Sequence, residues 1–352
     1  QVEGHYTAWL RERLNGLSKP SGREHALVDE HGAAPQIWRT AIPEELYPTS
    51  YVGEEACRFL AEQDDTPFLL QVSFPDPHHP FTPPGKYFDM YNPANIELPN
   101  SFSHPTGART DLPEFMLQGY QVGDKNPDAY WPFHADEATV RRMIALNYGT
   151  ITMIDDVIGQ ILQALITANK ADDTVICFMS DHGDYMGDHG TVLKHGVHTR
   201  GLIRVPFIWN DPAKKHNEVK ADVSEVHGSA IDFAPTLLQR AGLKIPVGMQ
   251  GRDVVAKDAQ DLPVLIEDPG FGVYTDPDAD TSVRSLVFEN WRISVFEGSD
   301  LGELYELQSD PDELDNLWND SNQQDKKYHL LQLLLQRQIA LRDKSVLATN
   351  QA

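Results

Sequence analysis

Apolar and polar residues alternate along most of the chain in a way that predicts strands and helices in succession. Three nearly continuous apolar runs, residues 67–74, 174–180 and 205–209, have the composition of strands buried on both faces. Between the first two runs, apolar residues at steps of three and four predict a long helix. Its apolar face is expected to comprise Ile144, Tyr148, Ile151, Ile154, Ile158, Ile161 and Leu165. Because strands and helices in this order favour right-handed crossovers, we expect an α/β fold with a largely parallel central sheet flanked by helices.

The pattern changes after about residue 262. Short alternating runs predict an antiparallel meander over residues 264–266, 285–288, 291–296 and 303–307. Apolar positions between Lys327 and Leu341 predict a closing helix. We therefore expect two units, an α/β core over residues 1–262 and a small α+β subdomain with an antiparallel sheet over residues 263–352.

The composition excludes several classes of protein. Of the 352 residues 40% are hydrophobic, which is enough for a buried core and too many for a disordered chain. The formal net charge of -24 argues against a protein that binds the nucleic-acid backbone. No run reaches the roughly 18 apolar residues of a membrane helix, so we expect no membrane partner. Cys57 and Cys177 are too few for a disulfide scaffold and are expected to pack in the core.

The densest group of polar residues follows the second predicted strand, at residues 180–200. Open α/β sheets bind their ligands at the carboxyl ends of strands. Asp181 and His182 offer a carboxylate oxygen and an imidazole nitrogen, which are plausible ligands for a divalent cation. Lys194 offers a point charge that suits an oxyanion. The alternative is that these residues have a structural role only, as turn and capping residues, and that the histidines are solvated. Three acidic residues, four histidines, a lysine and four glycines within about twenty residues favour a site.

A second group, Pro77-His78-His79-Pro80, directly follows the first predicted strand. A histidine held between prolines has little conformational freedom, which suits a fixed proton donor or hydrogen-bond donor. The alternative is a rigid surface loop with exposed histidines. His78 is therefore a candidate catalytic residue.

These motifs together resemble the type I sulfatases of the alkaline phosphatase superfamily. The matching segments occur in the family's order from about residue 45 to residue 320: Pro77–Phe81, Ile154–Gly159, Ser180–Asp184, Met186–Gly190 with Lys194, Arg204–Ile208, Asp232–Leu238, and Glu303–Leu307 with Asp310–Glu313. The resemblance implies an alkaline-phosphatase-like core and the hydrolysis of a small-molecule or carbohydrate sulfate ester.

The resemblance also implies roles for four residues. Asp181 and His182 match the family's metal-ligand pair, with Ca²⁺ the expected ion and Mg²⁺ or Mn²⁺ as alternatives. Lys194 matches the lysine that contacts the sulfate oxygens, and His78 matches the histidine at the leaving-group oxygen. Such a metal and lysine would neutralise charge on the sulfate, while the histidine would protonate the departing alkoxide.

One part of the family's pattern is absent. Sulfatases use a cysteine or serine, matured to formylglycine, in a Cys/Ser-x-Pro-Ser/Ala-Arg motif, and further metal carboxylates from an Asp-Asp pair; both precede the matched segments. The nearest candidate is Ser18, but Gly22 displaces the arginine of the motif to Arg23. We therefore expect this chain, which begins at Gln1, to lack an N-terminal segment that carries the nucleophile. By itself it is expected to show no turnover.

Three alternatives remain open at this point. A phosphonate monoester or phosphodiester hydrolase would use the same scaffold and an Asp-His metal pair. A non-catalytic protein that binds sulfate or glycans would explain the missing nucleophile. A separate or cleaved chain could also complete the site. Few cysteines and no signal-like segment favour the cytoplasm, whereas a signal peptide upstream of Gln1 would indicate a periplasmic or secreted protein.

Overall fold

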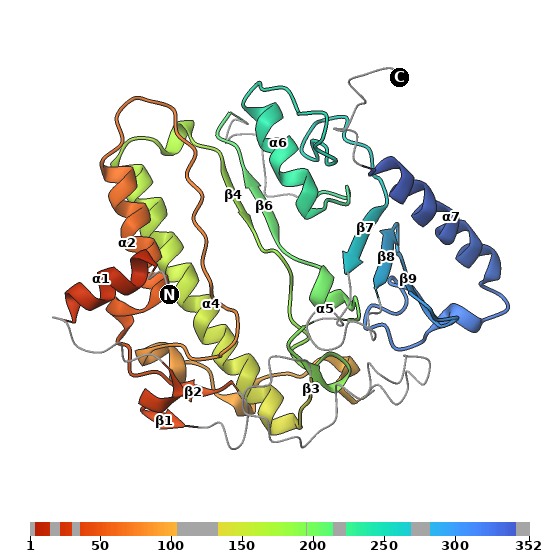
Figure 1. The fold of residues 1–352 in the computed structure, drawn as a ribbon, viewed down its shortest axis with the longest axis horizontal. Coiled ribbons are helices and arrows are strands. Elements are labelled where there is room, and N and C mark those ends of the chain that lie inside the picture. The colour runs from red at the N-terminus through yellow and green to blue at the C-terminus, as the bar shows by residue number, and fades with distance from the viewer. Residues whose placement is uncertain are drawn as a thin grey trace, which may run out of the picture.

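The structure is a computed structural model that describes residues 4–14, 22–29, 36–103, 133–194, 196–213, 223–268 and 282–342. Its α-helices are α1 (His5–Arg13), α2 (Pro48–Ala61), α4 (Glu137–Thr167), α5 (Arg200–Ile203), α6 (Phe233–Arg240) and α7 (Gln324–Ala340). Its strands are β1 (Val28–Asp29), β2 (Trp38–Arg39), β3 (Phe133–His134), β4 (Ile176–Met179), β5 (Thr191–Val192), β6 (Phe207–Asn210), β7 (Val264–Asp268), β8 (Val283–Phe288), β9 (Trp291–Phe296) and β10 (Gly302–Glu306). Figure 1 shows α2 and α4 on one side of the molecule and the C-terminal sheet with α7 on the other.

The long helix α4 confirms the helix predicted from the apolar spacing. It begins at Asp136, whose side chain accepts a hydrogen bond from the backbone N–H of Thr139 at 2.8 Å, as an N-cap residue should. Helix α4 is long and apolar enough to cross a membrane, but helices packed in a protein core meet the same two criteria.

The predicted apolar face of α4 is only partly correct. Tyr148 and Ile151 are each 45% exposed, and the buried side instead includes Met143, Leu146 and Met153. The helix is apolar over more than one stripe, and α2 packs so closely that a side chain added at Gly53 would collide with Val157 of α4. Packing against α2 and against the core clusters that contain Phe81 and Tyr87 therefore selected the buried face, which helical periodicity does not specify.

The mixed α/β class is confirmed, but the prediction of a largely parallel sheet is wrong for the part of the chain described. Strands β4 and β6 pair antiparallel, with Cys177 opposite Trp209, and every other ladder is antiparallel as well. The connection from β4 to β6 runs through β5 and α5, and α5 has only four residues, so it lacks the long helix that usually forms the crossover between parallel neighbours. Residues 67–74 form no strand, and neither they nor β6 are buried on both faces, since Leu69 is 79% and Ile208 59% exposed.

The C-terminal meander is confirmed. Strands β10, β9, β8 and β7 lie in this order in one antiparallel sheet. Leu286, Ile293 and Leu304 of three neighbouring strands are fully buried, and they pack in one cluster with Leu330 and Leu334 of α7. Helix α7 thus covers one face of this sheet, as Figure 1 shows.

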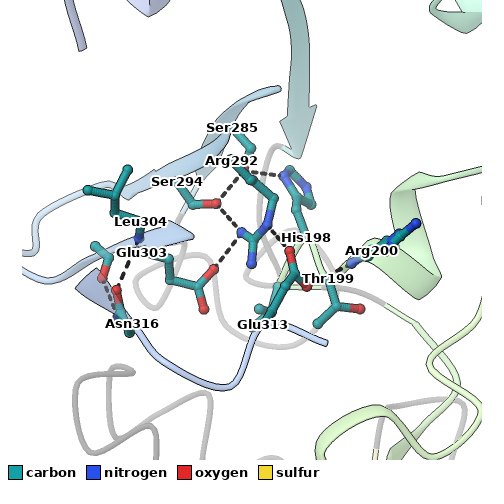
Figure 2. A network of polar contacts seen from close by, with 12 residues as sticks. His198, Thr199, Arg200, Ser285, Arg292, Ser294, Glu303, Leu304, Glu313 and Asn316 are labelled. Carbon is teal, nitrogen blue, oxygen red and sulfur yellow. Dashed lines mark hydrogen bonds and ion pairs between the residues drawn. The ribbon is translucent and has the colours of Figure 1, made fainter. Parts of the chain in front are cut away.

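A buried ion-pair network holds this sheet against the segment around α5 (Figure 2). The side chain of Arg292, on β9, is 0% exposed, so its charge needs buried partners. Its Nε donates to Glu313 at 2.5 Å, and one Nη donates to Glu303 at 2.8 Å and to Ser294 at 2.6 Å. The second oxygen of Glu313 accepts the backbone N–H of Arg200 at 2.9 Å. One carboxylate therefore joins the C-terminal sheet to the first residue of α5.

His198 adds a second link between the same parts. Its Nδ1 lies 2.8 Å from the hydroxyl of Ser285 on β8, which contacts the hydroxyl of Ser294 at 2.6 Å. The His198 side chain is buried, and this burial, with the nearby charge of Arg292, lowers its pKa to about 4. The imidazole is therefore neutral at pH 7.

We predict that Glu313→Ala destabilises the protein by about 3 kcal/mol, because it leaves Arg292 buried with Glu303 as its remaining carboxylate. Glu267→Ala is the matched control, since it removes an ion pair with Arg284 in the same sheet whose side chains are 55% and 31% exposed. That change should cost about 1 kcal/mol or less. Urea unfolding followed by circular dichroism measures both, and equal losses would contradict the assigned role of Glu313.

We also predict a pH dependence from His198. The unfolded chain binds a proton near pH 6.5, whereas the folded chain stays neutral until about pH 4. The contribution of His198 to the free energy of unfolding is therefore complete above pH 6.5. It is lost as the pH falls toward 4, and the total loss is roughly 3 kcal/mol. Arg284 also lowers this pKa, while Asp268 and Glu303 act to raise it.

Replacement with Asn, which keeps a polar atom near the position of Nδ1, should make stability less sensitive to pH in this window. Urea unfolding at several pH values between 4 and 7 measures the difference between the wild type and His198→Asn. His329→Asn, on an exposed position of α7, is the control and should leave the profile unchanged. Parallel profiles for the wild type and His198→Asn would show that the buried imidazole does not cause the dependence.

Candidate active site

The metal-ligand pair predicted from the sequence lies directly beyond the end of β4. One carboxylate oxygen of Asp181 accepts the backbone N–H of His182 at 2.9 Å, and the other lies 3.6 Å from the Nε2 of His182. The Asp181 side chain is 85% exposed, so its oxygens are open to a ligand. Desolvation acts to raise the pKa of Asp181, but the hydrogen bond from the backbone N–H of His182, with smaller contributions that include the charge of Lys194, outweighs it, so the pKa is lowered.

The tautomer of His182 follows from its surroundings. Its Nδ1 lies 2.7 Å from the carbonyl oxygen of Gly183, which can only accept a hydrogen bond. Nδ1 therefore carries the proton, and the neutral ring presents the lone pair of Nε2. A histidine that binds a metal through Nε2 is commonly oriented in this way.

Glycine is required at position 183 because α5 packs against the backbone there. The N–H of Gly183 donates to the carbonyl of Leu202 at 2.7 Å, and a Cβ on Gly183 would lie 1.9 Å from the carbonyl oxygen of Gly201. Any side chain would push α5 away. The backbone beyond His182 is thus held by the same short helix that Glu313 contacts.

Asp184 closes the loop between the metal pair and Lys194. Its carboxylate accepts the backbone N–H groups of Met186 and Leu193, each at 3.0 Å. Burial raises the pKa of Asp184 to about 7 despite these hydrogen bonds. Because Leu193 directly precedes Lys194, this carboxylate fixes the backbone position from which the lysine side chain extends. The sequence analysis counted Asp184 among the polar residues but did not assign this role to it.

Lys194 completes the cluster, and we call Asp181, His182 and Lys194 the 181–194 cluster. The Nζ of Lys194 lies 3.3 Å from the Nε2 of His182. Partial burial lowers the pKa of the lysine, while the charges of Asp184 and Asp181 oppose this shift. The structure therefore places a cation and the lone pair of an imidazole side by side at the end of β4.

His78 lies in the turn that follows residues 67–74. Its Nδ1 lies 2.5 Å from the carbonyl oxygen of His79, so Nδ1 carries a proton and Nε2 faces outward from this contact. No contact joins His78 to the 181–194 cluster among the described residues. Three residues later, Phe81 packs in the same core cluster as Val192 and Leu193, which brings the His78 turn to the part of the molecule that carries Lys194.

The residues present can supply part of a metal site. In the described part of the chain, no three His, Cys, Asp or Glu side chains gather closely enough to hold a metal. Asp181 and His182 contribute an oxygen and a nitrogen donor, and divalent cations take at least four ligands in proteins. The two donors suit such an ion chemically, and the remaining ligands must come from elsewhere.

Neither cysteine is suited to act as a nucleophile. Burial raises the pKa of Cys177 to about 11 and also raises that of Cys57, so both are protonated thiols at neutral pH. Ser18, the nearest candidate for the nucleophile, and His195, one of the four histidines in residues 180–200, lie outside the described residues.

A polar cavity of about 340 Å³ lies beside α5, and none of the four predicted site residues lines it. It is lined by Asp188, Arg200, Gly201, Arg204, Pro311, Asp312 and Glu313. The sequence analysis did not identify this cavity because its two walls are more than 100 residues apart in the chain.

Comparison with known proteins gives the family. The Sulfatase family model matches residues 25–243, and the model of the N-sulphoglucosamine sulphohydrolase C-terminal region matches residues 187–340. The chain is 30% identical over 343 residues to an arylsulfatase of Clostridium perfringens, covering 94% of this chain and 65% of that protein. It is 28% identical over 348 residues to the multifunctional alkaline phosphatase superfamily protein PehA of Trinickia caryophylli, covering 91% of this chain and 65% of that protein.

Solved structures show the same fold. The phosphonate monoester hydrolase of Agrobacterium radiobacter superimposes with a TM-score of 0.80 at 24% identity, over 97% of this chain and 70% of that one. The phosphonate monoester hydrolase of Silicibacter pomeroyi gives 0.78 at 21% identity, over 97% and 69%. The chain thus spans about two thirds of the length of these proteins. Since the Sulfatase model matches more than half of its residues, in the segment that contains the 181–194 cluster, the chain belongs to the sulfatase family.

Proposed function

We propose that this chain supplies metal ligands and charge-stabilising side chains for the hydrolysis of a sulfate monoester. The observation that carries the proposal is the 181–194 cluster. In it a carboxylate, an imidazole lone pair and an ammonium group converge at the end of β4, with His182 Nε2 at 3.3 Å from Lys194 Nζ. This arrangement can hold a divalent cation and a sulfate group together in a chain whose overall charge repels anions.

Each residue has a separate role in this proposal. Asp181 and His182 would hold the cation, with Ca²⁺ favoured and Mg²⁺ or Mn²⁺ as alternatives, and the bound ion would polarise the sulfate. Lys194 places its ammonium against a sulfate oxygen and stabilises the charge that develops there. Asp184 binds the backbone N–H groups of Met186 and of Leu193, the residue before this lysine, and so ties the lysine to the loop that follows the metal pair.

His78 is proposed as the group that protonates the leaving oxygen. Its Nδ1 proton is engaged by the carbonyl of His79, so the proton that it transfers would be carried on Nε2 of the imidazolium form. The contact with His79 restrains the ring and directs Nε2 away from its own backbone.

The nucleophile is proposed to lie outside this chain. The two cysteines are protonated, and relatives such as the Clostridium perfringens arylsulfatase extend over a further third of their length beyond the match. A formylglycine in a segment N-terminal to Gln1 would complete the site together with the cation. This chain alone should then show no turnover. We also propose that the chain is divided into two units, residues 1–262 and 263–352.

The proposed substrate class is a carbohydrate sulfate ester. One relative, 24% identical over 97% of this chain, is an N-acetylglucosamine-6-O-sulfatase of Bacteroides thetaiotaomicron. A phosphonate monoester is the second candidate, because the two structural neighbours described above are phosphonate monoester hydrolases with TM-scores of 0.80 and 0.78.

The experiment that separates these functions uses a protein in which this chain is joined to the nucleophile segment. Its kcat/KM is measured on an aryl sulfate and on the matching aryl phosphonate monoester, with Lys194→Ala as the control that should lower the proposed activity. A higher rate on the sulfate is expected. A dominant phosphonate rate would replace the sulfatase proposal, and sulfate binding without turnover of either ester would favour the non-catalytic alternative.

A second prediction concerns His78. In the same complete protein, His78→Ala should lower kcat about 10²-fold or more for an alkyl or sugar sulfate, whose alkoxide needs a proton to depart. The loss should be much smaller for a nitrophenyl sulfate, whose leaving group is stable as an anion. His329→Ala is the control for a histidine away from the site, and equal losses on both esters would remove His78 from the role of proton donor.

A further inference from the structure

The turn that carries His78 is anchored through the side chain of Asp76. The backbone N–H of His78 donates to the carbonyl oxygen of Pro75 at 3.3 Å, so Asp76 lies inside the turn. The carboxylate of Asp76 accepts hydrogen bonds from the hydroxyls of Thr49 and Tyr47. Tyr47 is the N-cap residue of α2, and Thr49 lies in the first turn of that helix. The turn is thereby fixed to the start of α2.

Both partners of Asp76 lie in the protein core. Thr49 is 0% exposed, and Tyr47 is buried in a cluster with Met153 of α4. Burial raises the pKa of Asp76, whereas the two hydroxyl hydrogen bonds and the positive charge of His78 act to lower it. Because packing restrains the two hydroxyls, they hold the carboxylate, and with it the turn, at one position.

A second set of contacts restrains the His78 ring. Its centroid lies 4.0 Å from that of the His79 ring, and the two planes are inclined by 32°. His79 is buried, and its ring lies 6.4 Å from that of Phe81 in the core. The carbonyl oxygen of His79 accepts the Nδ1 proton of His78. His79 therefore restrains the ring and Asp76 restrains the backbone from which it extends, while His78 itself remains exposed to a ligand.

We propose that Asp76 is a positioning residue, which holds the turn where Nε2 of His78 meets the leaving oxygen of the ester. This inference rests on the proposed function, in which His78 transfers a proton to that oxygen. Proton transfer needs the two groups within hydrogen-bond reach, and a displacement of about 1 Å can lower a rate about 10²-fold. Asp76 contacts the hydroxyls at the start of α2, so it acts through His78 and does not touch the substrate.

The complete protein, in which this chain is joined to the nucleophile segment, tests the proposal. Asp76→Asn keeps the shape of the side chain but removes its charge and one of its two acceptor oxygens. It should lower kcat about tenfold or more for an alkyl or sugar sulfate. The loss should be less than about twofold for a nitrophenyl sulfate, whose leaving group departs without a proton. KM should stay unchanged for both esters.

Thr49→Val is a second variant that tests the same anchor. It removes a hydroxyl that donates to Asp76 and nearly keeps the shape of the side chain. It should show the same selective loss on the alkyl ester, on a smaller scale, because the hydroxyl of Tyr47 still holds the carboxylate.

Asp211→Asn is the matched control. The side chain of Asp211 is 6% exposed and pairs with Arg240, so this variant also alters a buried carboxylate. Asp211 follows Asn210, which pairs with Ile176 at the start of β4. It therefore lies at the end of the β4–β6 ladder opposite to Asp181, and its substitution should leave both rates unchanged. Circular dichroism checks that all variants fold.

A double variant separates an action through His78 from an independent effect. Adding Asp76→Asn to His78→Ala should cause no further loss of kcat on the alkyl sulfate, because the group that Asp76 positions is already absent. A further loss in the double variant would overturn the proposal. Equal losses of Asp76→Asn on both esters would leave Asp76 with a structural role alone, and an unchanged kcat on the alkyl sulfate would also contradict the proposed positioning.

Nuclear magnetic resonance of the imidazole nitrogens in residues 1–352 gives a readout without turnover. In alkaline solution, His78 should be one tautomer with its proton on Nδ1, and its signal is identified by its loss in His78→Ala. Asp76→Asn should add the tautomer protonated on Nε2, because the released turn no longer fixes the ring against the carbonyl of His79. An unchanged spectrum would overturn the proposal. A changed spectrum, with no hydrolysis of either ester by the complete wild type, would support the hold of Asp76 on His78 and count against the proposed function alone.

Discussion

The carboxylate of Glu313 is shared between two parts of the protein that are distant in the chain. One oxygen pairs with the fully buried guanidinium of Arg292, and the other accepts the backbone N–H at the start of α5. A buried charge tolerates little displacement, because desolvation is offset only at close range and in good geometry. The start of α5 is therefore tied to the C-terminal sheet, and α5 in turn packs against the backbone of Gly183, next to the metal-ligand pair. The C-terminal sheet thus contributes to the candidate active site without supplying a predicted site residue.

The candidate site itself combines few groups with strong local control. Asp181, His182 and Lys194 lie close together because the loop between them is closed by the buried Asp184 through two backbone hydrogen bonds. In a chain with a net charge of -24, attraction for an anionic ester must be local, and Lys194 with a cation at Asp181 and His182 would provide it. The open carboxylate and the exposed lone pair of Nε2 leave room for ligands from outside the described residues.

The α/β part of the molecule differs in character from the C-terminal sheet. The four C-terminal strands bury their inner side chains against α7, and β8 and β9 each pair along both edges. Residues 67–74, β4 and β6 have the apolar composition of central strands, yet they expose leucine, phenylalanine and isoleucine side chains. This apolar composition led to the prediction of a buried parallel sheet. In the described residues, however, β4 pairs only with β6, and the two strands are antiparallel.

The local order of residues determined much of this protein. The apolar spacing specified the long helix α4, the alternating runs specified the antiparallel meander, and a single stretch after β4 contained Asp181, His182 and Lys194. These features depend on near neighbours in the chain, whose spacing is visible in a sequence. Tertiary structure alone decided the rest: which face of α4 is buried, the antiparallel pairing of β4 with β6, and the contacts of Ser285 with His198 and of Glu313 with Arg200, which join residues 87 and 113 positions apart. Such contacts depend on the path of the folded chain, and periodicity in the sequence does not record that path.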